Sequence, residues 1–445
     1  MSMTRPGPST MSKIRLSALS QNARIQAILF SPVVLSSLHL LETVMSPIQL
    51  TRVPRISSRS LQLVFKSLVF LVLLLNIRAI PGGWHWRVFW VITKVRIQYL
   101  LQRTRASFAL TLAGKTGRRK AEALNMRMEK WLEGITPVGA HPLEFQTVYR
   151  TWVSLDESDF NGHMSNSSYP KVLDCARMKA AMELFPQFLR VGGVIPLSST
   201  HFHFIKELPV FARYELRLSI GAWDEKWMYV VGRFITKNKT TKNTTRSSSK
   251  SVTPGASDET NVTIPAPSLS IKIPGSETAA VARLVTELGD SDISEEHVTL
   301  HTVCVSRVCF KHGRITVPPA VLMATNGVSV HPWELAGAQS STSEQPKYSP
   351  SNPPPTWTSE SKKLILKSMG GSPKQVREFY RGQWREVLDA EKGKVAVEGG
   401  DPDSYIPWWD RALGDGGPVE ERQKQRLEIC RYLVGGLEGV RGMVS

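Results

Sequence analysis

The stretch LDESDFNGHMSN, residues 155–166, concentrates polar chemistry in one short turn. Asp159, Asn161, His163 and Asn166 follow the spacing D-x-N-x-H-x-x-N. Two interpretations are open. In the first, Asp159 and Asn161 form an Asx-type turn and His163 is a structural residue. In the second, the acid, the amide and the imidazole form the catalytic group of an enzyme. The segments that flank the turn help to distinguish the two interpretations.

The turn follows a predicted strand and precedes a predicted helix. Residues 145–155, FQTVYRTWVSL, alternate between apolar and polar positions as a half-buried strand does. Residues 167–193 carry apolar side chains at helical spacing on more than one face, which indicates a buried helix. Pro170 fits the first turn of this helix, and the pair Gly192-Gly193 ends it.

Alternating apolar segments after the helix predict further strands. These segments are VIPLSSTHFHFIKEL (194–208), ARYELRLSIGAWD (212–224), KWMYVVGRFIT (226–236), VTLHTVCVSRVCF (298–310) and GRITVPPAVLMAT (313–325). One strand, a long apolar helix and several antiparallel strands predict an α+β fold in which the sheet wraps around the helix.

Positive charge is concentrated near the N-terminus. The chain of 445 residues has a formal net charge of +18, and residues 1–130 hold 20 of its 56 Lys and Arg against only three acids. These basic residues surround an apolar run instead of lying along a polar face. The predicted partner is therefore an anionic membrane surface, and nucleic acid is not expected.

The apolar run LQLVFKSLVFLVLLLNI predicts a transmembrane helix over residues 61–80, because a spanning helix needs roughly 20 apolar residues. Residues 84–103 then mix Trp and Tyr with Arg and Lys, as interfacial helices do. A buried core helix with a basic face is the alternative. Basic residues are denser after the span than before it, which predicts a single-pass protein with its main part on the cytoplasmic side. The expected membrane is that of the endoplasmic reticulum. The Arg- and Ser-rich residues 1–60 also suit a mitochondrial leader.

A predicted strand, the D-x-N-x-H turn and a buried helix wrapped by a sheet resemble the hot-dog fold of the thioesterase-like superfamily, in the branch related to 4-hydroxybenzoyl-CoA thioesterase and to thioesterase superfamily member six. The resemblance covers residues 143–236 and 296–326. A similar run occurs in acyl-carrier-protein thioesterases, where its Asp, Asn and His are catalytic. The resemblance therefore implies that Asp159, Asn161 and His163 are the catalytic residues.

This sequence departs from the pattern of the acyl-carrier-protein thioesterases at two points. The carrier-protein enzymes place an acid or Cys on the strand after the helix, whereas no Asp or Glu lies between Glu183 and Glu207 here. His163 is followed by Met, Ser and Asn instead of the usual H-x-N-N. The expected substrate-binding residues are those beside the turn and those that could replace the acid: Asn166, Ser167, Ser199, His201 and His203.

Around the hot-dog domain the chain divides by composition. The expected segments are a basic disordered leader (1–60), the transmembrane helix (61–80), a basic interfacial helix and linker (81–135), the hot-dog domain (136–333) with a disordered insertion (237–295), a Pro- and Ser-rich linker (334–359) and a helical C-terminal extension (360–445). The four scattered cysteines indicate a reducing compartment instead of a disulfide framework.

Thioester hydrolysis needs a base or nucleophile at the acyl carbon and hydrogen-bond donors for the oxyanion. Asp159 can take the first role, and the N–H groups at the start of the predicted helix can supply the donors. His163 can orient the carboxylate or a water, and Asn161 can position that water. His201 and His203 share a strand face, but two His without a neighbouring acid or Cys do not predict a metal site.

The predicted function is hydrolysis of fatty-acyl or polyketide-type thioesters of coenzyme A or a carrier protein, without a cofactor, by a membrane-anchored enzyme. The family forms dimers in which one subunit's turn meets the other's strands, so a homodimer is expected, unless the C-terminal helices cover the free sheet edge. A catalytically inactive hot-dog protein that binds acyl chains or lipids at a membrane is the alternative, favoured by the missing acid. A dehydratase or hydratase is disfavoured by the D-x-N-x-H spacing.

Overall fold

The computed structural model describes residues 58–237, 277–288, 298–331, 348–355, 357–365 and 372–435. Nearly all of the predicted leader, most of the predicted insertion and most of the Pro- and Ser-rich linker lie outside the described residues. The chain forms two units, one ending at Val72 and the other starting at Leu73.

Helix α3 (Ser58–Leu75) contains most of the apolar run. Its large apolar side chains, among them Phe65, Phe70 and Leu73, are exposed. The helix ends at Leu75, before the expected end at Ile80, and turns lead on to the next helix. In the described part of the chain, no helix reaches both the length and the apolar character needed to cross a membrane. The transmembrane helix over residues 61–80 therefore stays a prediction.

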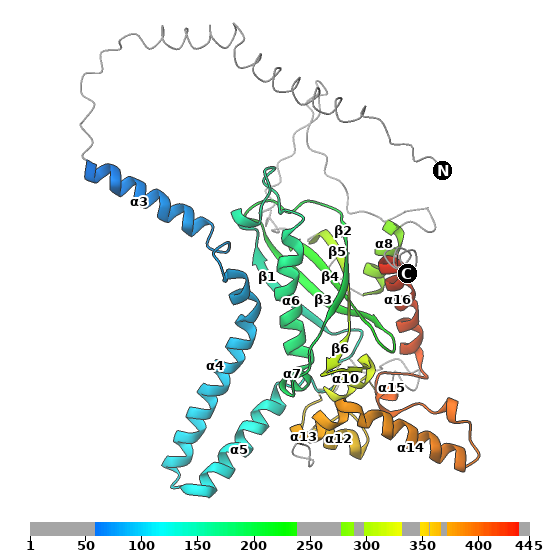
Figure 1. The fold of residues 1–445 in the computed structure, drawn as a ribbon. Helices are drawn as coiled ribbons and strands as arrows, with labels where there is room; N and C mark the ends of the chain where they lie inside the picture. Colours follow the sequence, from blue (N-terminus) through cyan, green and yellow to red (C-terminus); the bar gives the residue numbers. More distant parts are fainter. Residues whose placement is uncertain are drawn as a thin grey trace, which may run out of the picture. The chain divides into compact units, whose positions relative to one another are not determined.

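A five-stranded antiparallel sheet forms the centre of the second unit (Figure 1). In chain order its strands are β1 (Gln146–Trp152), β2 (Leu197–Phe204), β3 (Arg213–Trp223), β4 (Met228–Lys237) and β5 (Val298–Val308). In space the order is β1-β3-β4-β5-β2, so β1 and β2 are the edge strands. Every neighbouring pair is antiparallel, which confirms the predicted α+β class with an antiparallel sheet.

Helix α6 (Ser168–Leu184) lies along one face of this sheet (Figure 1). Tyr169, Val172, Leu173 and Ala176 of α6 are buried in one cluster with apolar residues of β3, β4 and β5. The predicted helix was expected to continue to residue 191. It breaks at Phe185, because Pro186 cannot donate the next helical hydrogen bond, and a short helix α7 (Pro186–Arg190) follows.

The opposite face of the sheet is covered by α8 (Glu277–Glu287) and α16 (Pro418–Gly435). The expectation of disorder over residues 237–295 is wrong for α8. Val281 and Leu284 of α8 are buried against apolar side chains of α16 and of the sheet, and this burial stabilises the helix.

The predicted strand over residues 313–325 is also corrected. Only β7 (Ile315–Val317) is extended, and it pairs with β6 (Phe310–His312) in a separate hairpin. Pro318 and Pro319 end the strand because neither has an N–H for pairing, and Pro319 opens helix α10 (Pro319–Thr325).

The described residues of the predicted C-terminal extension are largely helical, and they belong to the core of the second unit instead of forming an appendage. Besides α16, they form α12 (Ser359–Ile365), α13 (Pro373–Glu378), α14 (Trp384–Val397) and α15 (Trp408–Ala412). Phe379, Tyr380 and Trp408 share an apolar cluster with Phe188 and Phe310. The Phe188 and Tyr380 rings meet edge to face at 5.2 Å. Residues 136–333 therefore do not have a closed core of their own.

The expected interfacial segment forms two helices, α4 (Gly83–Leu112) and α5 (Gly117–Gly134). One face of α4 packs on the domain: Val88 is buried, and Trp84 Nε1 donates a hydrogen bond to the Lys171 carbonyl at 3.2 Å. The other face is exposed and carries an apolar stripe at helical spacing, formed by Trp86, Trp90, Ile97, Leu101, Phe108 and Leu112. The core-helix alternative thus describes one face of α4, and membrane contact of the exposed stripe stays a prediction.

Candidate active site

Asp159 lies in a tight turn that its own side chain closes. Asp159 Oδ1 accepts hydrogen bonds from the backbone N–H groups of Asn161, at 2.9 Å, and of His163, at 3.2 Å. The Asp159 N–H donates to the His163 carbonyl at 2.8 Å, and Gly162 between them has a φ of 77°, which favours glycine. This is the geometry of the Asx-type interpretation. It also holds the carboxylate in one orientation.

The turn is attached to the chain that follows β2. Met164 donates its N–H to the Leu208 carbonyl at 2.7 Å, and Val210 donates to the Gly162 carbonyl at 2.8 Å. The Met164 side chain is buried in the cluster beneath α6, whereas Phe160 is fully exposed. The turn is therefore anchored on its C-terminal side, and its tip lies at the surface.

Glu207 approaches the imidazole of the turn. His163 Nδ1 lies 3.4 Å from Glu207 Oε2, and the Glu207 carbonyl accepts a hydrogen bond from His301 Nδ1 at 2.9 Å. His301 is itself buried and bonded to Thr236 Oγ1 at 2.9 Å, and burial lowers its pKa, which favours the neutral ring. Strand β2, which follows the helix, carries no acid. Glu207, three residues after the end of β2, nevertheless places a carboxylate beside the turn.

Asn166 and Ser167 lie directly before α6. Both are exposed, and Ser167 Oγ is 2.9 Å from Ser165 Oγ. Ser167 occupies the N-cap position of α6, but its side chain does not cap the helix. These two residues therefore stay next to the turn, as the motif implied.

Ser199, His201 and His203 lie away from the turn in the same chain. They alternate on β2 and so share one face of the sheet. His201 and His203 pair with β5 residues whose side chains lie under α8 and α16, on the face opposite α6. His201 Nε2 and His203 Nδ1 lie 2.8 and 3.2 Å from Glu277 Oε1 of α8. Within one chain the structure does not bring these three residues to Asp159.

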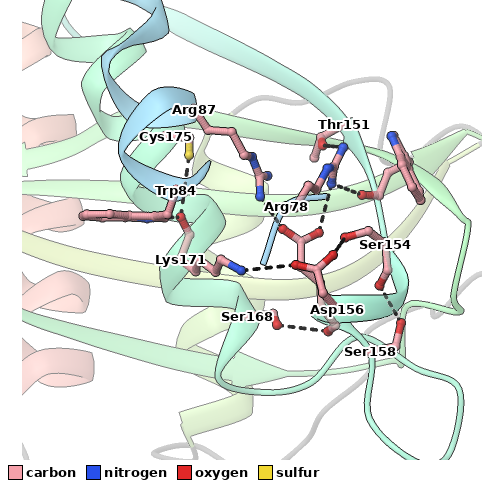
Figure 2. A network of polar contacts seen from close by, with 12 residues as sticks. Arg78, Trp84, Arg87, Thr151, Ser154, Asp156, Ser158, Ser168, Lys171 and Cys175 are labelled. Atoms are coloured by element: carbon pink, nitrogen blue, oxygen red, sulfur yellow. Dashed lines mark hydrogen bonds and ion pairs between the residues drawn. The ribbon is translucent and has the colours of Figure 1, made fainter. Parts of the chain in front are cut away.

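A buried carboxylate precedes the turn, and Figure 2 shows its surroundings. Glu157 is fully buried at the end of a single 3-10 turn. It accepts a charge-assisted hydrogen bond from Arg78 at 3.1 Å and forms an ion pair with Arg87 of α4. Arg78 also donates to the Trp152 carbonyl at 2.9 Å and lies 4.4 Å above the Trp152 ring. The segment before α6 is thus joined to α4 and to the turns that precede it.

The same network reaches the start of α6. Lys171 lies 3.5 Å from Asp156, and Ser168 Oγ donates to the Glu157 carbonyl at 2.9 Å (Figure 2). Burial opposes the charge on Arg87, but the attraction of Glu157 outweighs it and raises the pKa of Arg87. The sequence did not indicate the two arginine contacts of this network, because Arg78 and Arg87 precede Glu157 by 79 and 70 residues and no local pattern links them.

A cavity of about 1160 Å³ lies along the second half of α6, and we refer to it as the α4–α6 cavity. Its walls come from α4, α5, α6, α7, α13 and the sheet. None of the residues predicted for the site lines it. In the described ranges there is also no group of three His, Cys, Asp or Glu side chains that could hold a metal ion.

Residues 153–257, which include the turn, α6 and β2 to β4, match the thioesterase-like superfamily. The resemblance to the thioesterase-like superfamily is confirmed. Together with the antiparallel sheet around α6, the match supports the hot-dog fold for this thioesterase-like region.

Similar proteins cover part of this chain. A probable thioesterase of Saccharomyces cerevisiae is 36% identical over 93 residues, which is 20% of this chain and 40% of that protein. Thioesterase lcsJ of Purpureocillium lilacinum is 27% identical over 192 residues, 38% of this chain and 58% of that protein. The chain thus spans about half the length of these curated relatives. A solved 1,4-dihydroxy-2-naphthoyl-CoA thioesterase from Synechocystis is 10% identical with a TM-score of 0.24, covering 41% of this chain and 96% of that one.

Proposed function

We propose that this protein hydrolyses acyl thioesters and that Asp159 is the base or nucleophile. The observation that carries the proposal is the fixed carboxylate of Asp159, held by two backbone N–H groups, within the region that matches the thioesterase-like superfamily. A carboxylate with one orientation can direct an attack on the acyl carbon with little loss of entropy.

The reaction adds water across the thioester and yields a carboxylic acid and a thiol. Asp159 takes a proton from the attacking water, or attacks the acyl carbon itself before water releases the acid. The first N–H groups of α6, which begins at Ser168, stabilise the oxyanion together with the helix dipole. His163 orients the water with the help of Glu207, and Asn161 positions it.

The substrates that we propose are fatty-acyl or polyketide-type thioesters of coenzyme A or of an acyl-carrier protein. Thiol release from acyl-CoAs of increasing chain length, measured with the purified full-length protein, tests this proposal. The full chain is needed because the C-terminal helices share their apolar core with α7 and β6. Without thiol release from any of these substrates or from an acyl-carrier protein, hydrolysis is ruled out.

A catalytically inactive protein that binds acyl chains or lipids is the second candidate. The two hydrogen bonds that Asp159 Oδ1 accepts favour it, because an Asx-type turn with a purely structural role explains both of them. Acyl-CoA binding without thiol release would select this candidate over hydrolysis.

The proposed location is a membrane, at the endoplasmic reticulum or, as the second choice, in the mitochondrion, with α3 as the single anchor. The exposed stripe of α4 and the absence of any acid between Glu42 and Glu122 support contact with an anionic surface. The bulk of the chain would be on the cytoplasmic side.

Removal of residues 1–75 should change how the protein is held by membranes. The full-length chain should stay in the membrane pellet at about 1 M salt, because apolar burial is not screened as surface charge is. The truncated chain keeps Arg78 and α4, so it should bind vesicles containing phosphatidylserine at low salt, and a smaller fraction of it should stay bound at high salt, because the contribution of its basic residues is screened. Sedimentation with vesicles at both salt concentrations measures this. Salt-resistant binding of the truncated chain contradicts a single anchor in α3.

We also propose a homodimer. Strands β1 and β2 are the sheet edges, and α16 packs on a face of the sheet. The chain truncated at residue 75, studied by sedimentation equilibrium without detergent, should have twice the mass of the chain at micromolar concentration. An active and strictly monomeric species contradicts a site shared between subunits.

A further inference from the structure

About half of the residues that wall the α4–α6 cavity lie outside the part of the chain that matches the superfamily. Ile92, Val95 and Tyr99 of α4 and Trp131 of α5 form one side, and none of them lies within residues 153–257. The cavity therefore has to be interpreted from its own chemistry. Its volume of about 1160 Å³ is slightly above the usual range for small-molecule sites, roughly 300–1,000 Å³.

The middle of the cavity is apolar. Met178 and Ala181 of α6 stand opposite the α4 wall, and buried side chains of the sheet, Ile220, Met228 and Val308, line it as well. A space lined in this way gives water few hydrogen bonds and favours an apolar occupant.

The charged groups that line the cavity include two ion pairs. Arg190 of α7 forms a bidentate ion pair with Glu129 of α5, with distances of 3.0 and 3.2 Å. Arg177 of α6 donates to Asp174 at 2.7 Å and to Thr200 at 3.2 Å. Because the groups of these two pairs already bind each other, they favour a ligand without a charge beside them, and Arg96 and Glu133 are the other charged residues of the lining.

The shape of the cavity fits an extended chain. The α6 residues that line it run from Asp174 to Leu184, a distance of about 15 Å along the helix axis. The first of them lies about 9 Å along α6 from Ser168, where the helix begins after the Asp159 turn. A thioester held at that turn could therefore direct its acyl chain along α6 towards the cavity.

We propose that the α4–α6 cavity binds the medium- or long-chain aliphatic part of the acyl substrate, with α4 and α5 as its outer wall. This inference rests on the proposed function, and it names the substrate class. Each methylene that leaves water contributes a gain in affinity of roughly fourfold. Affinity therefore rises with chain length until the cavity is filled.

Photocrosslinking tests the cavity without depending on hydrolysis. The full-length protein in phosphatidylcholine nanodiscs is exposed to palmitoyl-CoA that carries a diazirine at the end of its chain, and the labelled peptides are mapped by mass spectrometry. We expect labels on α4 and α6 peptides that line the cavity, such as those with Ile92 and Met178, and competition by palmitoyl-CoA. Labels confined to other surfaces, or labels that palmitoyl-CoA does not displace, overturn the proposal.

Substitutions that fill the cavity provide a second test of the proposal. Ala181→Trp puts an indole into the cavity from α6 and should lower specific labelling at least tenfold. Val95→Trp fills it from the α4 wall and should do the same, so the test remains valid if one variant does not fold. Ala121→Trp, at an exposed position of α5 outside the lining, is the matched control and should leave labelling unchanged. Unchanged labelling in both folded cavity variants contradicts the proposal.

Failure of this inference and failure of the proposed function give different results. Specific cavity labelling without thiol release means that the cavity binds acyl chains and that hydrolysis is the wrong function. Thiol release with equal kcat/KM for butyryl-CoA and palmitoyl-CoA, and without cavity labelling, means that the protein hydrolyses thioesters and that the cavity does not bind the acyl chain. A second copy of the chain as the occupant would show as a loss of dimer in the Trp variants with no loss of chain-length dependence, and this also contradicts the proposal.

Discussion

Asp159→Asn should reduce thioester turnover by roughly 100- to 10,000-fold, the usual contribution of general acid–base catalysis. The amide keeps an oxygen that can accept the two hydrogen bonds from the backbone N–H groups of Asn161 and His163. The turn therefore survives the change, and only the negative charge and the proton affinity are lost. Measured kcat with the best acyl-CoA substrate gives the effect, and thermal unfolding shows whether the fold is intact.

Asp224→Asn is the matched control for this substitution. Asp224 Oδ1 accepts from the backbone N–H groups of Lys226 and Trp227 at 2.9 and 2.7 Å, so it closes a turn of the same kind far from the proposed site in the chain. Its substitution should leave kcat unchanged. An Asp159→Asn protein that turns over substrate at the parental rate excludes Asp159 as the base or nucleophile.

Glu157→Gln should destabilise the fold by about 3–5 kcal/mol, because removing one partner of a buried ion pair leaves uncompensated buried charge. Glu157 is fully buried and contacts two guanidinium groups, those of Arg78 and Arg87. The amide keeps the size of the side chain and one acceptor, so the loss measures charge instead of packing. The free energy of unfolding, from urea titration followed by Trp fluorescence, is the measurement.

Glu122→Gln is the control for that experiment. Glu122 pairs with Arg118 on the surface of α5, and both side chains are more than half exposed. Such pairs contribute only about 0.3–0.5 kcal/mol. If Glu157→Gln and Glu122→Gln have the same free energy of unfolding, the buried network does not stabilise the fold.

The elements that could be predicted from the sequence are those with a local signature. The alternation of Phe145 to Trp152 and the helical spacing from Val172 to Leu184 identified a strand and the central helix, because each periodicity is set by burial of one side of the element. The break at Pro186 was missed because the apolar spacing continues through Phe188, which packs on the C-terminal helices instead.

The helix α8 could not be predicted, because only Val281 and Leu284 give it a buried face and the partner surface is supplied by α16. For the candidate site, the sequence identified the turn at Asp159 and its position before α6. It could not place Glu207 beside His163, since side-chain direction at the end of a strand depends on how the chain turns next. Nor could it place His201 and His203 on the face opposite α6, because facing depends on sheet order.

The ion pair between Arg87 and Glu157 couples the packing of α4 on the domain to the residues just before the Asp159 turn. A free-energy coupling between two such sites is reciprocal. A change that separates α4 from the domain, such as adsorption of its exposed stripe to a membrane, would remove this ion pair and destabilise the residues just before Asp159. Conversely, a ligand that orders the turn would raise the equilibrium constant for packing of α4 on the domain by the same factor.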